Sequence, residues 1–240
     1  MPTQLQIENL SKRIREYKNR YLKKSYSELD ESGTRLMINS FLADVLEYVE
    51  LQDIKTEYRI RGEYADYIIQ LNRKKHFVVE VKAIQLDLSE KHLRQSLAYA
   101  ANEGIDWIIL TNGKQLQLYK VLFKKPIDVQ QIFSLDLSDL KELKTASRYL
   151  IYLTKKSVQK NELDHFWTRF SALEPSELSK SFYSIEIIRF LRRTLKKKTD
   201  LYFSENDILD SVYKIITTKI NSVEPRTPIE IKCKKKHSEK

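Results

Sequence analysis

The sequence is poor in the residue types that several large protein classes require. Its single cysteine, Cys233, cannot form an internal disulfide, and no Cys/His cluster resembles a zinc site. The four glycines lie too far apart for a Walker loop or a dinucleotide fingerprint. No apolar run approaches the ~18 residues of a membrane-spanning helix, and the first residues lack a signal peptide's apolar stretch. These absences argue against a motor ATPase, a Rossmann dehydrogenase and a membrane protein, and they predict a soluble, cytoplasmic protein.

Positive charge is plentiful and unevenly distributed. The chain of 240 residues has a formal net charge of +10, of which residues 1–140 carry +1 and residues 141–240 carry +9. A basic half beside a nearly neutral half indicates a polyanionic partner, most simply nucleic acid. A merely solubilising surface is the alternative, and composition does not decide between the two.

Hydrophobic periodicity predicts an α/β protein with a mixed sheet flanked by helices and a helical C-terminal region. The predicted helices of the first half cover 4–23, 31–49 and 89–102, and the strands 54–61, 65–71, 76–84, 106–111, 115–123 and 129–135. Further helices are predicted over 138–157, 161–171, 176–198 and 205–219. We therefore expect an α/β domain over 1–137, a helical region over 138–224 and a basic tail over 225–240.

The predicted strand 76–84 carries charge where a buried strand should carry none. Val78, Glu80 and Lys82 share one face, and the other face is wholly apolar. Apolar residues on both faces are typical of a central strand. A carboxylate and an ammonium there cost several kcal/mol unless they are paired, hydrated or bound to a metal. A plain ion pair on a half-exposed strand is the ordinary interpretation of an isolated Glu-x-Lys.

Asp66 adds a second carboxylate to this strand's neighbourhood. If strands 65–71 and 76–84 form a hairpin around the polar turn 72–75, Asp66 lies opposite Glu80 or Lys82. Two carboxylates held this close repel each other unless a divalent cation neutralises them. The spacing therefore predicts a metal site.

These residues resemble the PD-(D/E)xK nuclease superfamily, and more narrowly the N-terminal nuclease domain of type I restriction enzyme R subunits and its stand-alone relatives. The resemblance covers about residues 5–135. It rests on six pieces in order: Asp30-Glu31-x-x-Thr34-Arg35, Glu57-Tyr58, Asp66, Glu80-Val81-Lys82, Gln95-x-x-x-Tyr99 and Trp107 to Gly113. One departure is Ala65, which stands where the superfamily's name has Pro. This change removes no ligand.

The resemblance implies a restriction-endonuclease-like fold and a site for Mg²⁺, with Mn²⁺ as a substitute. Asp66, Glu80 and the Val81 carbonyl would hold the ion, and Glu31 would complete the acidic site, directly or through water. Lys82 would orient or deprotonate the attacking water and stabilise charge on the phosphorus centre. By the same resemblance, Gln95 would position Lys82 or the phosphate, and Tyr99 would support Gln95.

Each of the accessory residues also has an ordinary structural interpretation. Gln95 and Tyr99 fit a polar stripe on a helix. Glu31 could instead pair with Arg35, four residues later on the same helix. The residues alone leave these alternatives open.

Cations recur along one side of the segment 184–198, at the spacing of a helix face. They are Arg189, Arg192, Arg193, Lys196 and Lys197. Ile187, Ile188, Leu191 and Leu195 form the opposite, buried stripe. Such a row suits backbone phosphates and would give salt-dependent affinity without sequence preference. A solvated helix face is the ordinary alternative, and a helix lying on a membrane surface is a weaker one.

The leading hypothesis is a Mg²⁺-dependent DNA endonuclease of restriction or defence type. It would act alone, as a homodimer or with other defence subunits; without motor motifs it is not a complete type I R subunit. The alternative is a non-catalytic nucleic-acid-binding or assembly module that keeps the nuclease fold. A nuclease or toxin directed at RNA is a third hypothesis.

Overall fold

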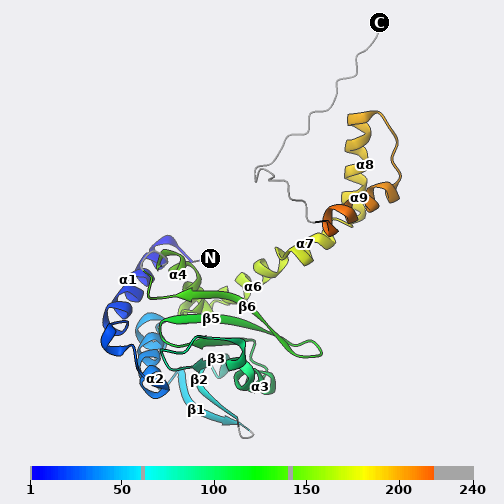
Figure 1. The fold of residues 1–240 in the computed structure, drawn as a ribbon. Coiled ribbons are helices and arrows are strands. Elements are labelled where there is room, and N and C mark those ends of the chain that lie inside the picture. The colour runs from blue at the N-terminus through cyan, green and yellow to red at the C-terminus, as the bar shows by residue number, and fades with distance from the viewer. Residues whose placement is uncertain (1, 61–62, 140–142, 219–240) are drawn as a thin grey trace. The chain divides into compact units, whose positions relative to one another are not determined.

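The computed structural model describes residues 2–60, 63–139 and 143–218, and within β1 and β2 it leaves out the side chains of residues 57–64. Its centre is a six-stranded sheet whose spatial order follows the chain (Figure 1). The strands are β1 (Ile54–Ile60), β2 (Glu63–Leu71), β3 (Lys74–Val81), β4 (Trp107–Thr111), β5 (Gln115–Leu122) and β6 (Asp128–Asp136). All six strands predicted from the sequence are present.

The sheet is mixed because one connection crosses over. The neighbouring strands pair antiparallel except β3 and β4, which are parallel. Parallel neighbours need a long crossover, and α3 (Arg94–Glu103) with the preceding turn η3 (Glu90–Leu93) supplies it. The α/β class predicted from the sequence is therefore confirmed.

Helices cover both faces of the sheet. On one face α3 packs against β2, β3, β4 and β5 and buries Tyr99 and Ala100, together with Leu93 of η3. Side chains alternate along β2, so Tyr67 faces the other way from Ile68, and its hydroxyl donates to the Arg35 carbonyl of α2 (Glu31–Ser40). The helices α1 (Gln4–Tyr21) and α4 (Leu143–Leu150) pack against each other, and α4 also contacts β6.

Three predicted helices are shorter or interrupted in the structure. The helix predicted over 31–49 ends with a π-helical turn, η2 (Phe41–Val45), because Glu47 adopts a left-handed φ of 67°. The helix predicted over 138–157 is divided at Thr154, whose ψ of 148° is extended; η4 (Ile151–Leu153) precedes it and α5 (Lys155–Gln159) follows. Ser184, with ψ of 143°, likewise separates α7 (Pro175–Ser181) from α8 (Ile185–Thr199).

The chain divides into two compact units, Met1–Phe166 and Trp167–Lys240, with the division inside α6 (Glu162–Ala172). It lies later than the expected boundary at 137/138, because α4 packs on α1 and β6 and so belongs to the first unit. The predicted basic tail and Cys233 lie outside the described residues. In the described part of the chain, no helix is long and apolar enough to cross a membrane.

The second unit is built on the pair of helices α8 and α9 (Glu205–Thr217). Ile188 of α8 is buried against Ile208 and Val212 of α9, with Leu191 and Leu195 partly buried beside them. The apolar stripe predicted for 184–198 is thus present. The helix α9 begins with the predicted capping box, in which the Asp207 amide donates to the Ser204 hydroxyl and the Ser204 amide donates to Asp207.

Replacing Ser204 with alanine is expected to destabilise α9 by about 1 kcal/mol, because one amide of its first turn loses its acceptor. The bonds to Ser204 hold the pKa of Asp207 below its usual value, so their contribution is present at neutral pH and is lost on acidification through that lowered pKa. Hydrogen exchange of α9 amides measures both effects. The matched control is Ser211→Ala, which removes an exposed hydroxyl bonded within α9 and should leave exchange of the first turn unchanged.

Candidate active site

The hairpin of β2 and β3 places Asp66 beside Glu80. The two strands pair Tyr67 with Val79 and Ile68 with Val78, so the next pair in the same register is Asp66 and Glu80. The turn is tight because Asn72 and Arg73 both adopt positive φ, which a two-residue hairpin loop of the favoured type requires. Of the two partners predicted from the sequence, the register selects Glu80.

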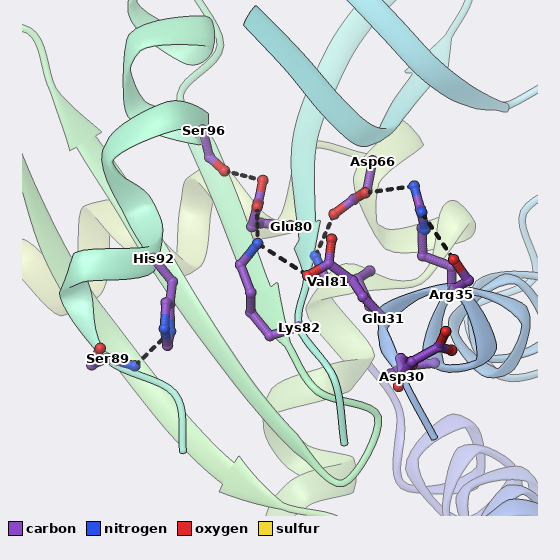
Figure 2. Close-up of polar contacts among 12 residues, drawn as sticks. Asp30, Glu31, Arg35, Asp66, Glu80, Val81, Lys82, Ser89, His92 and Ser96 are labelled. Carbon is purple, nitrogen blue, oxygen red and sulfur yellow. Dashed lines mark hydrogen bonds and ion pairs between the residues drawn. The ribbon is translucent and has the colours of Figure 1, made fainter. Parts of the chain in front are cut away.

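Glu80 is a buried carboxylate whose two oxygens both have partners (Figure 2). Its side chain is 5% exposed. One oxygen lies 2.6 Å from Lys82 Nζ, and the other accepts a 2.7 Å hydrogen bond from the Ser96 hydroxyl of α3. Because β3 is central and both its faces are covered, these two contacts replace the water that Glu80 would otherwise bind.

Asp66 is held at the start of the neighbouring strand by two donors. One oxygen accepts a 2.8 Å bond from the Val81 amide, and the other lies 3.2 Å from Arg35 Nη1. Burial raises the pKa of Asp66 to about 6; the Val81 bond opposes the rise, the Glu80 charge adds to it, and the Arg35 charge opposes it. The charged form of Asp66 is therefore disfavoured in this partly buried space, first by burial and then by the neighbouring Glu80 charge.

Glu31 approaches the same place from the first turn of α2, which Asp30 caps by accepting from the Gly33 amide. Its carboxylate lies 3.5 Å from Lys82 Nζ, on the opposite side of the ammonium from Glu80 (Figure 2). In the described part of the chain Glu31 forms no ion pair with Arg35, which contacts Asp66 instead. The alternative pairing of Glu31 with Arg35 is therefore wrong.

Lys82 is the positive charge between these carboxylates. It forms ion pairs with Glu80 and Glu31, and the charge of Asp66 also acts on it. Burial alone would lower the pKa of Lys82, but its hydrogen bond to Glu80 and the charges of Glu80, Glu31 and Asp66 outweigh burial and raise it. Its backbone amide donates to the Thr111 carbonyl of β4, which fixes the strand end that carries the side chain. The sequence prediction that Asp66, Glu80 and Lys82 lie together is thus met by the geometry.

The donor set is compatible with Mg²⁺. Among the residues that the structure describes, no three His, Cys, Asp or Glu side chains form a group that could hold a metal ion, so Glu31 does not join Asp66 and Glu80 in such a set. Mg²⁺ is bound in many proteins by one or two carboxylates and keeps several waters. Asp66 and Glu80 are two such carboxylates, and a cation bound beside Asp66 would oppose the burial that raises its pKa.

The accessory residues predicted on α3 lie at different depths. Gln95 is exposed, whereas Tyr99 is fully buried in the core beneath the sheet. Lys75 Nζ lies 5.9 Å from the centre of the Tyr99 ring. Tyr99 is therefore a core residue, and its support of Gln95 stays a prediction, as does the role of Gln95.

Sequence reasoning missed Ser96 and the use made of Arg35. Ser96 is fully buried and donates to Glu80. It lies between Leu93 and Ala100 on the inward face of α3, at spacings of three and four residues, and this position was the signal that could have identified it. Arg35 gave no such signal, because only the fold brings α2 to the end of β2.

The basic face of α8 is present but partly neutralised. Arg189 and Arg192 both approach Glu205 of α9, at 3.7 Å and 3.4 Å. Arg193, Lys196 and Lys197 are exposed and form no ion pair in the described part of the chain. Three of the five predicted phosphate-binding cations are therefore available without breaking a contact.

One family model matches the part of the chain that contains the candidate site. The family model described as "Type I restriction enzyme R protein N terminus" matches residues 30–133, a range that contains Glu31, Asp66, Glu80 and Lys82. A search of curated proteins found no match.

A solved structure described as a cryoEM structure of a DrdV-DNA complex is similar to 90% of the length of this chain, at 15% identity and a TM-score of 0.37. The alignment covers 21% of that other chain, so this chain spans about a fifth of its length. The family match confirms the resemblance derived from the sequence motifs. Over residues 30–133 this chain is similar to the N-terminal regions of type I restriction enzyme R proteins.

Proposed function

We propose that this chain is a Mg²⁺-dependent endonuclease that hydrolyses DNA phosphodiester bonds in restriction or defence. The observation that carries the proposal is the meeting of Asp66, Glu80 and Lys82 at one end of β2 and β3. Burying these three charges together costs folding free energy. A bound metal ion would offset part of that cost. The similarity to type I restriction enzyme R protein N-terminal regions favours phosphodiester hydrolysis as the reaction.

Asp66, Glu80 and the Val81 carbonyl would hold Mg²⁺, and Mn²⁺ would substitute for it. When bound, the ion acidifies a water and neutralises charge on the phosphoryl oxygens. Glu31 would contribute through water from its place beside Lys82. Arg35 and the Val81 amide hold Asp66 in the orientation that this role requires.

Lys82 would act as a cation at the phosphate. An ammonium has three donors and no acceptor, so while paired with Glu80 it can donate to the attacking water or to a phosphate oxygen but cannot accept a proton. Of the three roles implied by the resemblance, orientation of the water and charge stabilisation are favoured over deprotonation. In the reaction the water oxygen would bond to phosphorus and lose a proton to solvent, the bond from phosphorus to the leaving sugar oxygen would break, and that oxygen would take a proton from solvent, so that one water is consumed in total. Gln95 would position Lys82 or the phosphate, and Tyr99 would support Gln95.

The partner would be DNA, with other defence subunits or a second copy of the chain as further partners. Exposed Arg193, Lys196 and Lys197 of α8 supply backbone contacts without base recognition. The second candidate function is a non-catalytic nucleic-acid-binding or assembly module. It is favoured by the contacts that already occupy both oxygens of Glu80.

Digestion of supercoiled plasmid tests the proposal. The full chain is expected to convert the plasmid to nicked or linear forms with Mg²⁺ or Mn²⁺ and to leave it intact with EDTA. Asp66→Asn, which keeps the shape of the side chain but removes its charge, should abolish cutting with either metal. The matched control is Asp106→Asn, which removes a half-exposed carboxylate paired with Lys120 at the other end of the sheet, and it should cut like the unmodified chain.

The same digest decides among the hypotheses. Absence of cutting at every protein and metal concentration supports the non-catalytic module. Cutting that survives EDTA, or that persists in Asp66→Asn, contradicts the metal site. Preferential cutting of an RNA substrate in parallel reactions would identify RNA, and not DNA, as the substrate.

A further inference from the structure

One hollow of the first unit has a lining that the site described above does not use. It has a volume of about 220 Å³ and is lined by Leu22, Lys23, Lys24, Ser27, Ile84, Lys114 and Ser138. That volume is below the ~300–1,000 Å³ of pockets that enclose drug-sized ligands, yet it exceeds the space of a single water. The hollow therefore suits a small group that is part of a larger molecule.

Its charge is of one sign. Lys23, Lys24 and Lys114 come from two distant segments of the chain, and in the described part of the chain none of them forms an ion pair. Other lysines of the same unit, such as Lys82 and Lys155, are paired with carboxylates. Three lysines that line one hollow make the electrostatic potential there positive, so the arrangement favours an anion.

The two serine hydroxyls of the lining already donate hydrogen bonds within the protein. Ser27 donates to the Lys24 carbonyl, and Ser138 donates to Asp136, a carboxylate outside the lining. The three ammonium groups are thus the donors that remain for a ligand. Unlike the planar guanidinium of arginine, a lysine ammonium binds phosphate as a point charge and not through two parallel hydrogen bonds.

The hollow lies at the same end of the sheet as the candidate active site. Ile84 follows Lys82 by two residues, so their Cα atoms are no more than about 7 Å apart. Lys114 follows the carboxyl end of β4, whose Thr111 carbonyl accepts from the Lys82 amide. A strand of nucleic acid with one phosphate at Lys82 therefore passes within reach of this hollow.

We propose that Lys23, Lys24 and Lys114 form a phosphate subsite that holds the nucleic-acid backbone beside the scissile bond. This inference rests on the proposed function for the identity of the ligand. It adds a second set of phosphate contacts, on the unit that carries the catalytic residues. It predicts that removing these lysines weakens binding even where no cleavage occurs.

Fluorescence anisotropy with a short labelled DNA duplex in EDTA measures binding without cleavage. The variant K23A/K24A/K114A is expected to bind about tenfold more weakly than the unmodified full chain. Its plot of log affinity against log salt should be less steep by about 1–3, since each lost phosphate contact lowers the slope by about 0.9. Circular dichroism checks folding, and S27E, which puts a carboxylate into the hollow and keeps all three lysines, should weaken binding in the same direction.

The matched control is K12A/K91A/K156A, which removes three positive charges from exposed positions of the same unit away from the hollow. It should keep the affinity and the salt slope of the unmodified chain. Equal weakening in both triple variants would mean that net charge alone acts, and would overturn the subsite. Unchanged binding in K23A/K24A/K114A would also overturn it.

The two proposals fail separately. A chain that never cuts plasmid, but loses DNA affinity in K23A/K24A/K114A and not in the control, contradicts the endonuclease and supports the subsite. A chain that cuts plasmid, but binds DNA equally with and without these lysines, supports the endonuclease and contradicts the subsite.

Discussion

Replacing Lys82 with methionine is expected to lower DNA cleavage at least about 100-fold, the loss typical when one preorganised donor to a developing charge is removed. Binding of DNA in EDTA should change little, because the other cations that contact the backbone remain. Initial rates of plasmid cleavage and anisotropy measure the two effects. The same change removes the ion-pair partner of buried Glu80, so the melting temperature should fall as well.

A second variant separates the loss of chemistry from the loss of stability. In Glu80→Gln/Lys82→Met the buried side chain is neutral and its oxygen can still accept from Ser96, so the melting temperature should recover relative to Lys82→Met. Cleavage should not recover, because both the cation and one ligand of the metal site are absent. Plasmid cleavage by Lys82→Met within about tenfold of the unmodified chain would contradict the electrostatic role.

Replacing Leu110 with alanine is expected to destabilise the first unit by about 2–5 kcal/mol. Leu110 is fully buried in β4, pairs in register with Glu80 of β3 and packs in the core beneath α3. For a chain of this size the loss corresponds to a melting temperature lower by about 2–4 °C per kcal/mol. Fluorescence of buried Trp107, measured in a Trp167→Phe background, follows the unfolding of this unit alone.

The matched control for this change is Leu36→Ala. Leu36 lies on α2 with 76% of its surface exposed, so the same truncation removes little buried area and substitutes a better helix former. Its melting temperature should stay within about 1–2 °C of the unmodified chain, as surface changes away from special features have small effects. Equal melting temperatures for the two variants would contradict the assignment of Leu110 to the core.

The hairpin that forms the candidate site could be predicted from the sequence because its determinants are local. Side chains alternate strictly along β2 and β3, so the turn at 72–75 limits the partner of Asp66 to two positions. The irregularity between Ile69 and Gln70 adjusts the pairing next to the turn, and the structure settles on Glu80. Glu80 stood out because it is a carboxylate among the apolar residues of 77–81, where a charge needs a partner.

The environment of the site could not be predicted in this way. Arg35 is 31 residues from Asp66 and Ser96 is 16 residues from Glu80, and helix spacing relates a residue only to its own helix. The interpretation of Glu31 and Arg35 as a pair within α2 was wrong for this reason. The packing of α2 on the sheet brings each of them to a charge on another strand.

Six strands, the crossover helix and the three charged side chains Asp66, Glu80 and Lys82 could be predicted from the sequence alone. These follow from periodicity and from the cost of burying a charge, both of which act over a few residues. Tertiary packing determines which donors hold the carboxylates, extends the first unit to Phe166, and brings Lys23, Lys24 and Lys114 to the lining of one hollow. Those contacts join segments far apart in the chain, and their geometry exists only after the helices have packed on the sheet.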